Sequence, residues 1–105
     1  MANKFHAIKT TIDGVVFDSR KESRRYSELL LLEKSKQIRN LELQPKFTLK
    51  VNGQMICNYF GDFAYFEGDR RIVEDVKSGP TRTPVYRLKR KLLLALHPGL
   101  DHREV

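Results

Sequence analysis

The stretch 58–77 reads NYFGDFAYFEGDRRIVEDVK and constrains the fold more than any other part of the chain. Two apolar runs, 59–66 and 72–76, flank the pair Gly68-Asp69. Glycine at the first central position of a two-residue turn favours a type II′ β-hairpin. The pair therefore predicts two antiparallel strands whose register can be counted outward from the turn.

The counted register gathers charged side chains on one face of this hairpin. It places Asp62 directly opposite Asp75, two residues from Lys77 and beside the small Ala64. Because side chains alternate along a strand, these residues share a face, and Glu74 points to the other. Like charges opposed across a sheet destabilise it by about 0.2–1 kcal/mol per pair. The sequence thus predicts a local loss of stability in this hairpin, and this loss requires an explanation.

Two interpretations of the opposed acids are open. A divalent cation between the carboxylates would reverse the repulsion, and hard oxygen ligands suit Mg²⁺ or Mn²⁺. Alternatively, Glu67 or Asp69 shifts the turn by one residue. Asp62 would then lie in solvent, and Asp75 would pair with Lys77.

Length and composition bound the remaining possibilities. A chain of 105 residues predicts one domain, residues 1–105. Its 20 Lys and Arg against 13 Asp and Glu give a net charge of +7, which favours nucleic acid or another polyanion, or serves solubility alone. A single cysteine, Cys57, fits a reducing cytoplasm. Without an apolar run near ~18 residues or a signal peptide, we expect no membrane association and a cytoplasmic location.

The first half of the chain predicts a β-hairpin over 5–17, turned at an Asp-Gly pair, and then a helix over 19–37. Ser19 and Glu22 have the spacing of a capping box at the start of this helix. Local rules favour that capping role for Glu22, although it also lies at the leading edge of the buried face.

Two strands, 41–51 and 55–66, follow around Asn52-Gly53, and Pro45 interrupts the first of them. The second strand is apolar on both faces, so we expect it to be central and covered on both sides.

Thr83-Pro84 then begins a helix over 84–96, and residues 100–105 supply a last short strand. The expected buried stripe of this helix is Val85, Leu88, Leu92, Ala95 and Leu96.

Basic residues crowd the start of the first helix and the whole second helix. A solvated surface is the default interpretation, but positive charge at a helix start opposes the helix dipole and suggests an anionic partner. The candidate phosphate contacts are Arg20, Arg24, Arg25, Arg82, Arg87, Lys89, Arg90 and Lys91.

Several other kinds of site find no support. His6, His97 and His102 lack zinc-ligand spacing, and no CxxC or HExxH pattern occurs. No Gly-rich loop precedes a helix, which argues against a nucleotide cradle.

The order helix, three strands, helix, strand, with Gly61-Asp62 on one strand and DVK at 75–77 on the next, resembles the PD-(D/E)xK nuclease superfamily. The segments TTIDGVVFDSRKESRRYSEL, LELQPKF, GDFAY and VEDVK are similar to a small phage-encoded family of formerly unknown function, related to Holliday junction resolvases. The resemblance implies an α/β (α+β) fold with a restriction-endonuclease-like core and an N-terminal β-hairpin. Gly61 stands where the motif's name has Pro.

The resemblance implies a site made of Glu22, Gln44, Asp62, Asp75, Val76 and Lys77. Asp62 and Asp75, with the carbonyl of Val76, would bind Mg²⁺ or Mn²⁺. Glu22 would be a further acidic ligand or would hold water, in place of the cap that local rules favour. Lys77 would orient or activate the attacking water, and Gln44 would line the site.

The expected function is metal-dependent endonucleolytic cleavage of DNA, selective for branched structures, in phage recombination or replication. The resemblance also implies a homodimer. The alternatives are a non-catalytic basic DNA-binding or inhibitory module on the same fold, and an RNA-directed nuclease. The retained, mutually repelling acids argue against an inactive module.

Overall fold

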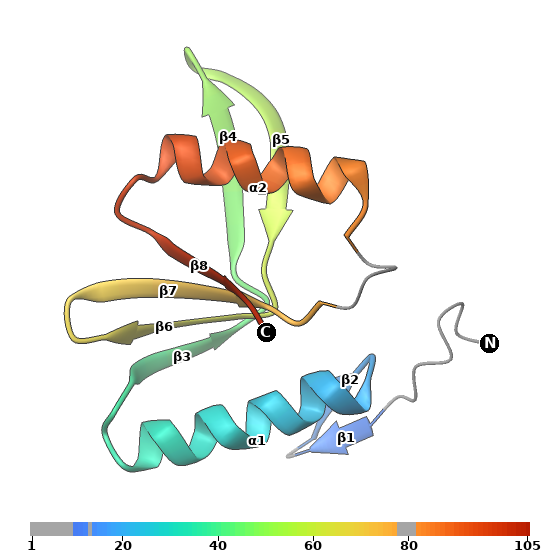
Figure 1. Cartoon of the computed structure of the whole chain (residues 1–105), viewed down its shortest axis with the longest axis vertical. Helices are drawn as coiled ribbons and strands as arrows, with labels where there is room; N and C mark the ends of the chain where they lie inside the picture. Colours follow the sequence, from blue (N-terminus) through green and yellow to red (C-terminus); the bar gives the residue numbers. More distant parts are fainter. Residues whose placement is uncertain (1–9, 13, 78–81) are drawn as a thin grey trace.

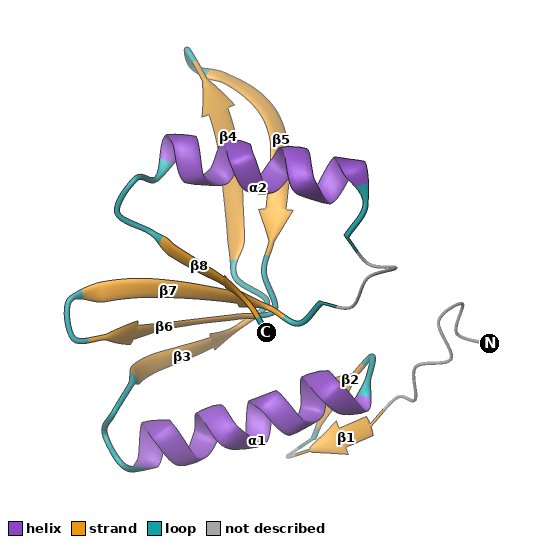
Figure 2. Ribbon diagram, in the orientation of Figure 1, coloured by secondary structure: helices purple, strands orange, loops and turns teal. Residues whose placement is uncertain are grey.

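The computed structural model describes residues 10–12, 14–77 and 82–105. These residues form a mixed α/β structure of two helices and eight strands, five of which, rather than three, lie between the helices (Figures 1 and 2). The elements are β1 (Thr10–Ile12), β2 (Val15–Phe17), α1 (Arg20–Lys34), β3 (Arg39–Leu43), β4 (Lys46–Val51), β5 (Gln54–Phe60), β6 (Phe63–Glu67), β7 (Arg70–Asp75), α2 (Pro84–Leu96) and β8 (Asp101–Glu104).

A four-stranded sheet with the order β3-β6-β7-β8 lies at the centre of the described structure. β3, β6 and β7 pair antiparallel, whereas β8 pairs parallel to β7. Parallel pairing needs a crossover connection, and α2 provides it. β7 is therefore an interior strand, with neighbours on both edges.

The hairpin of β6 and β7 has the register counted from the sequence, from Glu67 opposite Arg70 to Phe63 opposite Glu74. Gly68 has a φ of 63°, as a type II′ turn requires at this position. The pairing stops at Phe63, however, so Asp62 lies outside the strand and does not face Asp75 across the ladder.

The single central strand expected over 55–66 is wrong, because the chain bends at Gly61. The backbone N–H of Gly61 donates to the Pro45 carbonyl at 3.0 Å, a bond that proline could not make. A Cβ on Gly61 would lie only 2.7 Å from Cγ1 of Val73, so no side chain fits there. This close packing explains the glycine that precedes Asp62.

A matching bend occurs at Gln44, between β3 and β4. Gln44 has a left-handed backbone, with a φ of 51°, and its N–H donates to the Asp62 carbonyl at 3.0 Å. The two bends turn β4 and β5 out of the main sheet as a separate hairpin, which closes at Asn52-Gly53 with positive φ at both residues. The sequence-based turn prediction for this pair is confirmed.

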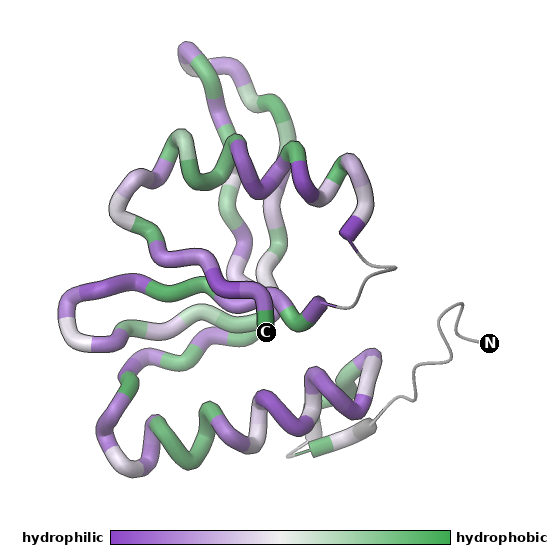
Figure 3. Tube along the Cα trace, viewed as in Figure 1, coloured by the Kyte–Doolittle hydropathy of each residue, from purple (hydrophilic) through white to green (hydrophobic). Residues whose placement is uncertain are grey.

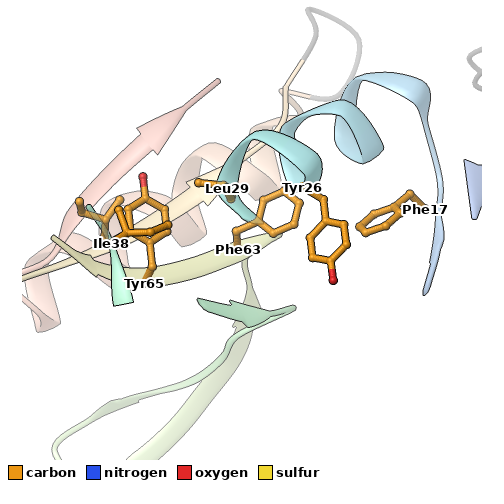
Figure 4. Packing of buried hydrophobic residues seen from close by; sticks show 7 residues of the cluster. Phe17, Tyr26, Leu29, Ile38, Phe63 and Tyr65 are labelled. Carbon is orange, nitrogen blue, oxygen red and sulfur yellow. The ribbon is translucent and has the colours of Figure 1, made fainter. Parts of the chain in front are cut away.

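Both faces of the central sheet are covered. α1 and the β1–β2 hairpin lie on one side, and α2 with the β4–β5 hairpin lies on the other (Figure 1). The α1 side buries Phe17, Tyr26, Leu29, Ile38, Phe63, Tyr65 and Ile72 (Figure 4). The α2 side buries Leu49, Tyr59, Ala64, Val73 and Leu93.

Both helices begin where the sequence predicts. The Ser19 side chain accepts a hydrogen bond from the Glu22 N–H at 3.1 Å, and Thr83 caps α2 in the same way. α1 ends at Lys34, three residues before the expected end, whereas the bounds of α2 agree with the prediction. Neither helix is long and apolar enough to cross a membrane.

The expected buried stripe of α2 is confirmed only in part. Leu92 and Leu96 are half-buried and pack against the core beside Leu93, which is fully buried. Val85 and Leu88 are instead 62% and 68% exposed, and Ala95 is exposed as well. Tyr86 and Arg90, on the same side as Leu93, hydrogen-bond Glu104 and His102 of β8. Polar contacts with β8 therefore fix the first half of α2, and the apolar pattern of the helix does not predict these contacts.

Candidate active site

Four of the predicted site residues lie at the start of α1, directly before β6, at the end of β7 and two residues after it, namely Glu22, Asp62, Asp75 and Lys77. The pKa of Glu22 is raised from 4.5 to about 7, mainly because the carboxyl is partly buried. The charges of Asp62, Asp18 and Asp75 contribute to this rise, and the charge of Lys77 opposes it. Glu22, Asp62, Asp75 and Lys77 are thus close enough to influence one another electrostatically. The structure brings together residues that lie up to 55 positions apart in the chain.

Asp62 reaches this cluster from the bend between β5 and β6. Its Oδ2 accepts the Val76 N–H at 2.7 Å, and its own N–H donates to the Glu74 carbonyl at 3.0 Å. The pKa of Asp62 is raised to about 6, mainly by burial; the hydrogen bond from Val76 opposes this rise, and the charge of Asp75 contributes to it. The acid is therefore fixed to β7 by its backbone and side chain, although it is not a cross-strand partner.

Asp75 is buried at the centre of a polar network on the α2 side of the sheet. Its Oδ2 accepts a hydrogen bond from the Tyr59 hydroxyl and another from Nε2 of His102, at 2.7 Å. Nδ1 of His102 accepts from Nε of Arg90 at 2.9 Å. Since arginine only donates, the imidazole proton resides on Nε2 and points to Asp75 and Tyr59. Three elements besides β7 therefore hold this carboxylate in one orientation.

Sequence reasoning missed this network and dismissed His102 for lack of zinc-ligand spacing. His102 reaches Asp75 because β8 pairs parallel to β7, with His102 opposite Val73. The usable signal was Asp75 itself, because a carboxylate in a buried strand requires hydrogen-bond partners. Asp18 is a further omission, since its charge helps to raise the pKa of Glu22 and Asp62.

Lys77 follows β7 and lies against the first turn of α2. Its Nζ is 4.0 Å from the centre of the Tyr86 ring, a cation–π distance. Its carbonyl accepts a hydrogen bond from Nζ of Lys21 at 2.8 Å, which ties the start of α1 to the end of β7. Of these two lysines, Lys77 acts on the acids, because its charge lowers the pKa of Glu22 and Asp62.

Glu74, the neighbour of Asp75, points to the opposite face and has a different environment. It is fully buried, and Arg25 contacts both of its oxygens, Nε to Oε1 at 2.7 Å and Nη2 to Oε2 at 2.6 Å. The Tyr65 hydroxyl also donates to Oε2. Arg25 was predicted to contact phosphate. Its guanidinium instead forms an internal ion pair with Glu74, so Arg25 is not part of the candidate DNA surface.

The other predicted basic residues lie on the two helices or directly before α2. Arg20, Arg24, Arg87 and Lys91 are exposed. Lys89 is half-buried, Arg82 lies 3.4 Å from Glu104, and Arg90 contacts His102. Hydrophilic residues accordingly dominate the first turns of α1 in Figure 3.

A cavity of about 180 Å³ opens beside Glu22 and Asp62. Its lining consists of Val15, Val16, Phe17, Glu22, Leu43, Gln44 and Asp62. The structure thus places Gln44 at the acidic cluster, as the sequence resemblance implies.

The oxygen-rich donor set of Glu22, Asp62 and Asp75 fits a hard divalent cation by its chemistry. Within residues 10–12, 14–77 and 82–105, no three His, Cys, Asp or Glu side chains are already spaced to hold a metal ion. The pKa values of Glu22 and Asp62 are raised, and a bound cation would lower them by stabilising the charged carboxylates. The site is therefore an acidic cluster with suitable ligands and no preformed cage.

The fold and site define a small mixed α/β structure with a partly buried acidic cluster near the end of a central strand. Residues 2–103 match the family model DUF1064, described as a protein of unknown function. The chain therefore belongs to the DUF1064 family. No curated protein and no solved structure matches it.

Proposed function

We propose that the protein is a metal-dependent endodeoxyribonuclease of the PD-(D/E)xK type. The observation that carries the proposal is the convergence of Glu22, Asp62 and Asp75 beside Lys77. The charges of Asp62, Asp18 and Asp75 raise the pKa of Glu22, and only the charge of Lys77 lowers it. Such an excess of negative charge in a partly buried site favours a bound cation.

The topology supports the same class. α1, the antiparallel strands β3, β6 and β7, then α2 and a strand parallel to β7 follow the order expected from the sequence resemblance. The β4–β5 hairpin is an insertion into this order, placed between β3 and β6. We infer that the central sheet and its two helices form a restriction-endonuclease-like core.

Each residue of the cluster has a distinct role in this proposal. Asp62 and Asp75, with Glu22 and the Val76 carbonyl, would hold Mg²⁺ or Mn²⁺. When bound, the ion lowers the pKa of a water molecule and stabilises negative charge on the phosphate. Lys77 adds a positive charge beside the reacting phosphate and orients the attacking water.

Tyr59 and His102 keep the Asp75 carboxylate oriented by occupying Oδ2. Hydrogen bonds of this kind to a metal-binding carboxylate restrict its rotation and tune its affinity for metal.

The exposed basic residues of both helices suit the sugar–phosphate backbone rather than base edges. Arg20 and Arg24 on α1 and Arg87 and Lys91 on α2 lie on elements whose starts flank the acidic cluster. A small nuclease with such a surface selects DNA by shape. We therefore propose branched DNA as the preferred substrate and a homodimer, which would present two active sites to two strands.

Purified protein should cleave DNA when Mg²⁺ or Mn²⁺ is added, and branched DNA faster than duplex or single-stranded DNA of equal length. Asp75→Asn should abolish cleavage and leave DNA affinity nearly unchanged, because the basic surface provides binding. Asp69→Asn, the same change in the exposed β6–β7 turn, is the matched control.

Full activity in Asp75→Asn would refute the assignment. Binding without cleavage by the wild type would favour the non-catalytic module, and preferential cleavage of RNA would favour the RNA-directed nuclease.

A further inference from the structure

The residues that line the cavity beside Glu22 and Asp62 are of two chemical kinds. The apolar residues, here called the wall, are Val15, Val16, Phe17 and Leu43 of β2 and β3. The polar residues, here called the rim, are Glu22, Gln44 and Asp62. Phosphate and metal ions need only the rim, so the apolar wall requires another explanation.

The cavity has the size of one planar ring system. Its volume is about 180 Å³, and a cavity of about 150 Å³ in another protein accepts benzene. A nucleobase is somewhat larger than benzene, is flat, and combines apolar faces with polar edges. An apolar wall with a polar rim matches that pattern.

Gln44 supplies a polar group suited to a base edge. An amide side chain offers a donor and an acceptor side by side, and pairs in this way with adenine. The left-handed backbone of Gln44, with a φ of 51°, is unusual for a residue with a side chain. Its N–H bond to the Asp62 carbonyl fixes it there, and such constrained residues cluster at functional sites.

We propose that this cavity binds the base of an unpaired nucleotide next to the phosphate that is cut. The inference rests on the proposed nuclease function and names its substrate class: DNA in which one nucleotide at the cleavage point is free of its partner. A base within a duplex cannot enter the cavity without first being unpaired. Recognition of an unpaired base would give selectivity for branch points without reading the surrounding sequence.

The test uses pairs of branched DNA substrates that differ at one unpaired position. One carries 2-aminopurine there, and the other carries an abasic site. Binding is followed with Ca²⁺ in place of Mg²⁺, by fluorescence of the 2-aminopurine and by competition, and cleavage is measured separately with Mg²⁺. We expect about tenfold weaker binding of the abasic substrate, the scale of one stacked base.

Val16→Phe enlarges one of the lining residues and should remove this preference. Val16 is 59% exposed, so the larger side chain does not need to enter the core. Val51→Phe is the matched control, because Val51 is a partly exposed strand residue at the far end of β4 and does not line the cavity.

The outcomes separate this inference from the proposed function. Cleavage of both substrates at equal rates, with equal affinity, would overturn the base-binding cavity and leave the nuclease standing. A fluorescence response that is lost in Val16→Phe, without cleavage under any metal, would support the cavity and overturn the nuclease. A preference that survives in Val16→Phe would place the base elsewhere and refute the inference.

Discussion

The two faces of β7 treat adjacent buried carboxylates in opposite ways. On the α1 side, Glu74 is fully buried, and Arg25 neutralises it with two hydrogen bonds while Tyr65 adds a third. On the α2 side, Asp75 receives hydrogen bonds from Tyr59 and neutral His102. The first carboxylate has a complete internal counter-charge, whereas the second is oriented by neutral partners.

This contrast distinguishes an acid that builds the fold from one that is available for chemistry. A buried charge is costly unless it is paired, and Glu74 is paired within the protein. Asp75 instead shares its surroundings with Asp62 and Glu22, whose pKa values are raised. In the proposed function, a bound cation would give Asp75, Asp62 and Glu22 the counter-charge that Arg25 gives Glu74.

The largest expected effect comes from removing the internal counter-charge. Arg25→Ala leaves Glu74 buried and unpaired, and should lower the free energy of unfolding by about 3–5 kcal/mol. Arg70→Ala breaks only the exposed pair with Asp101, and should cost about 0–1 kcal/mol. Chemical denaturation of both variants measures the difference. Equal losses would mean that Glu74 does not depend on Arg25.

A smaller effect should follow from loosening Asp75. His102→Asn removes the imidazole donor to Oδ2 and should weaken Mn²⁺ binding by about 10–100-fold. Electron paramagnetic resonance of free Mn²⁺ measures this affinity directly, without DNA. His97→Asn is the control, because His97 is exposed and no hydrogen bond joins its imidazole to Asp75. Unchanged Mn²⁺ affinity in His102→Asn would show that His102 packs in the core without affecting metal binding.

The smallest effect concerns pH. The folded-state pKa of Glu22 is about 7, above its ordinary 4.5, so the folded protein retains a proton that the unfolded chain releases between these values. Metal-free stability should therefore fall as pH rises through this window. Glu22→Gln should raise the Tm at pH 8 and change it little at pH 4. A pH profile of Tm identical to that of the wild type would contradict the raised pKa.

Much of the fold follows from local sequence rules. The Gly68-Asp69 turn predicts the register of β6 and β7, and Thr83-Pro84 predicts the start of α2, because short-range backbone geometry decides both. The bend at Gly61 escaped prediction. It depends on contacts with Pro45 and Val73, which are distant in the chain.

The candidate site likewise has a part that the sequence predicts and a part that only the folded structure reveals. Sequence spacing and family resemblance predict that Glu22, Asp62 and Asp75 share a site, and in the structure they lie close enough to shift the pKa values of Glu22 and Asp62. The role of His102 depends on the parallel pairing of β8 with β7, and that of Arg25 on the packing of α1 against Glu74. Neither contact leaves a pattern in the local sequence, so only the folded structure separates the neutralised acid from the available one.

The most direct test of the account is a Mn²⁺ titration of thermal stability in the wild type and in Asp62→Asn. The amide oxygen can still accept the Val76 N–H, so the substitution removes charge with little change in shape. Without metal the variant should melt at a higher temperature, because repulsion with Asp75 and Glu22 is reduced. Added Mn²⁺ should raise the Tm of the wild type by linkage and that of the variant much less. Equal responses to Mn²⁺ would show that the acids do not share an ion, and would contradict the proposed metal site.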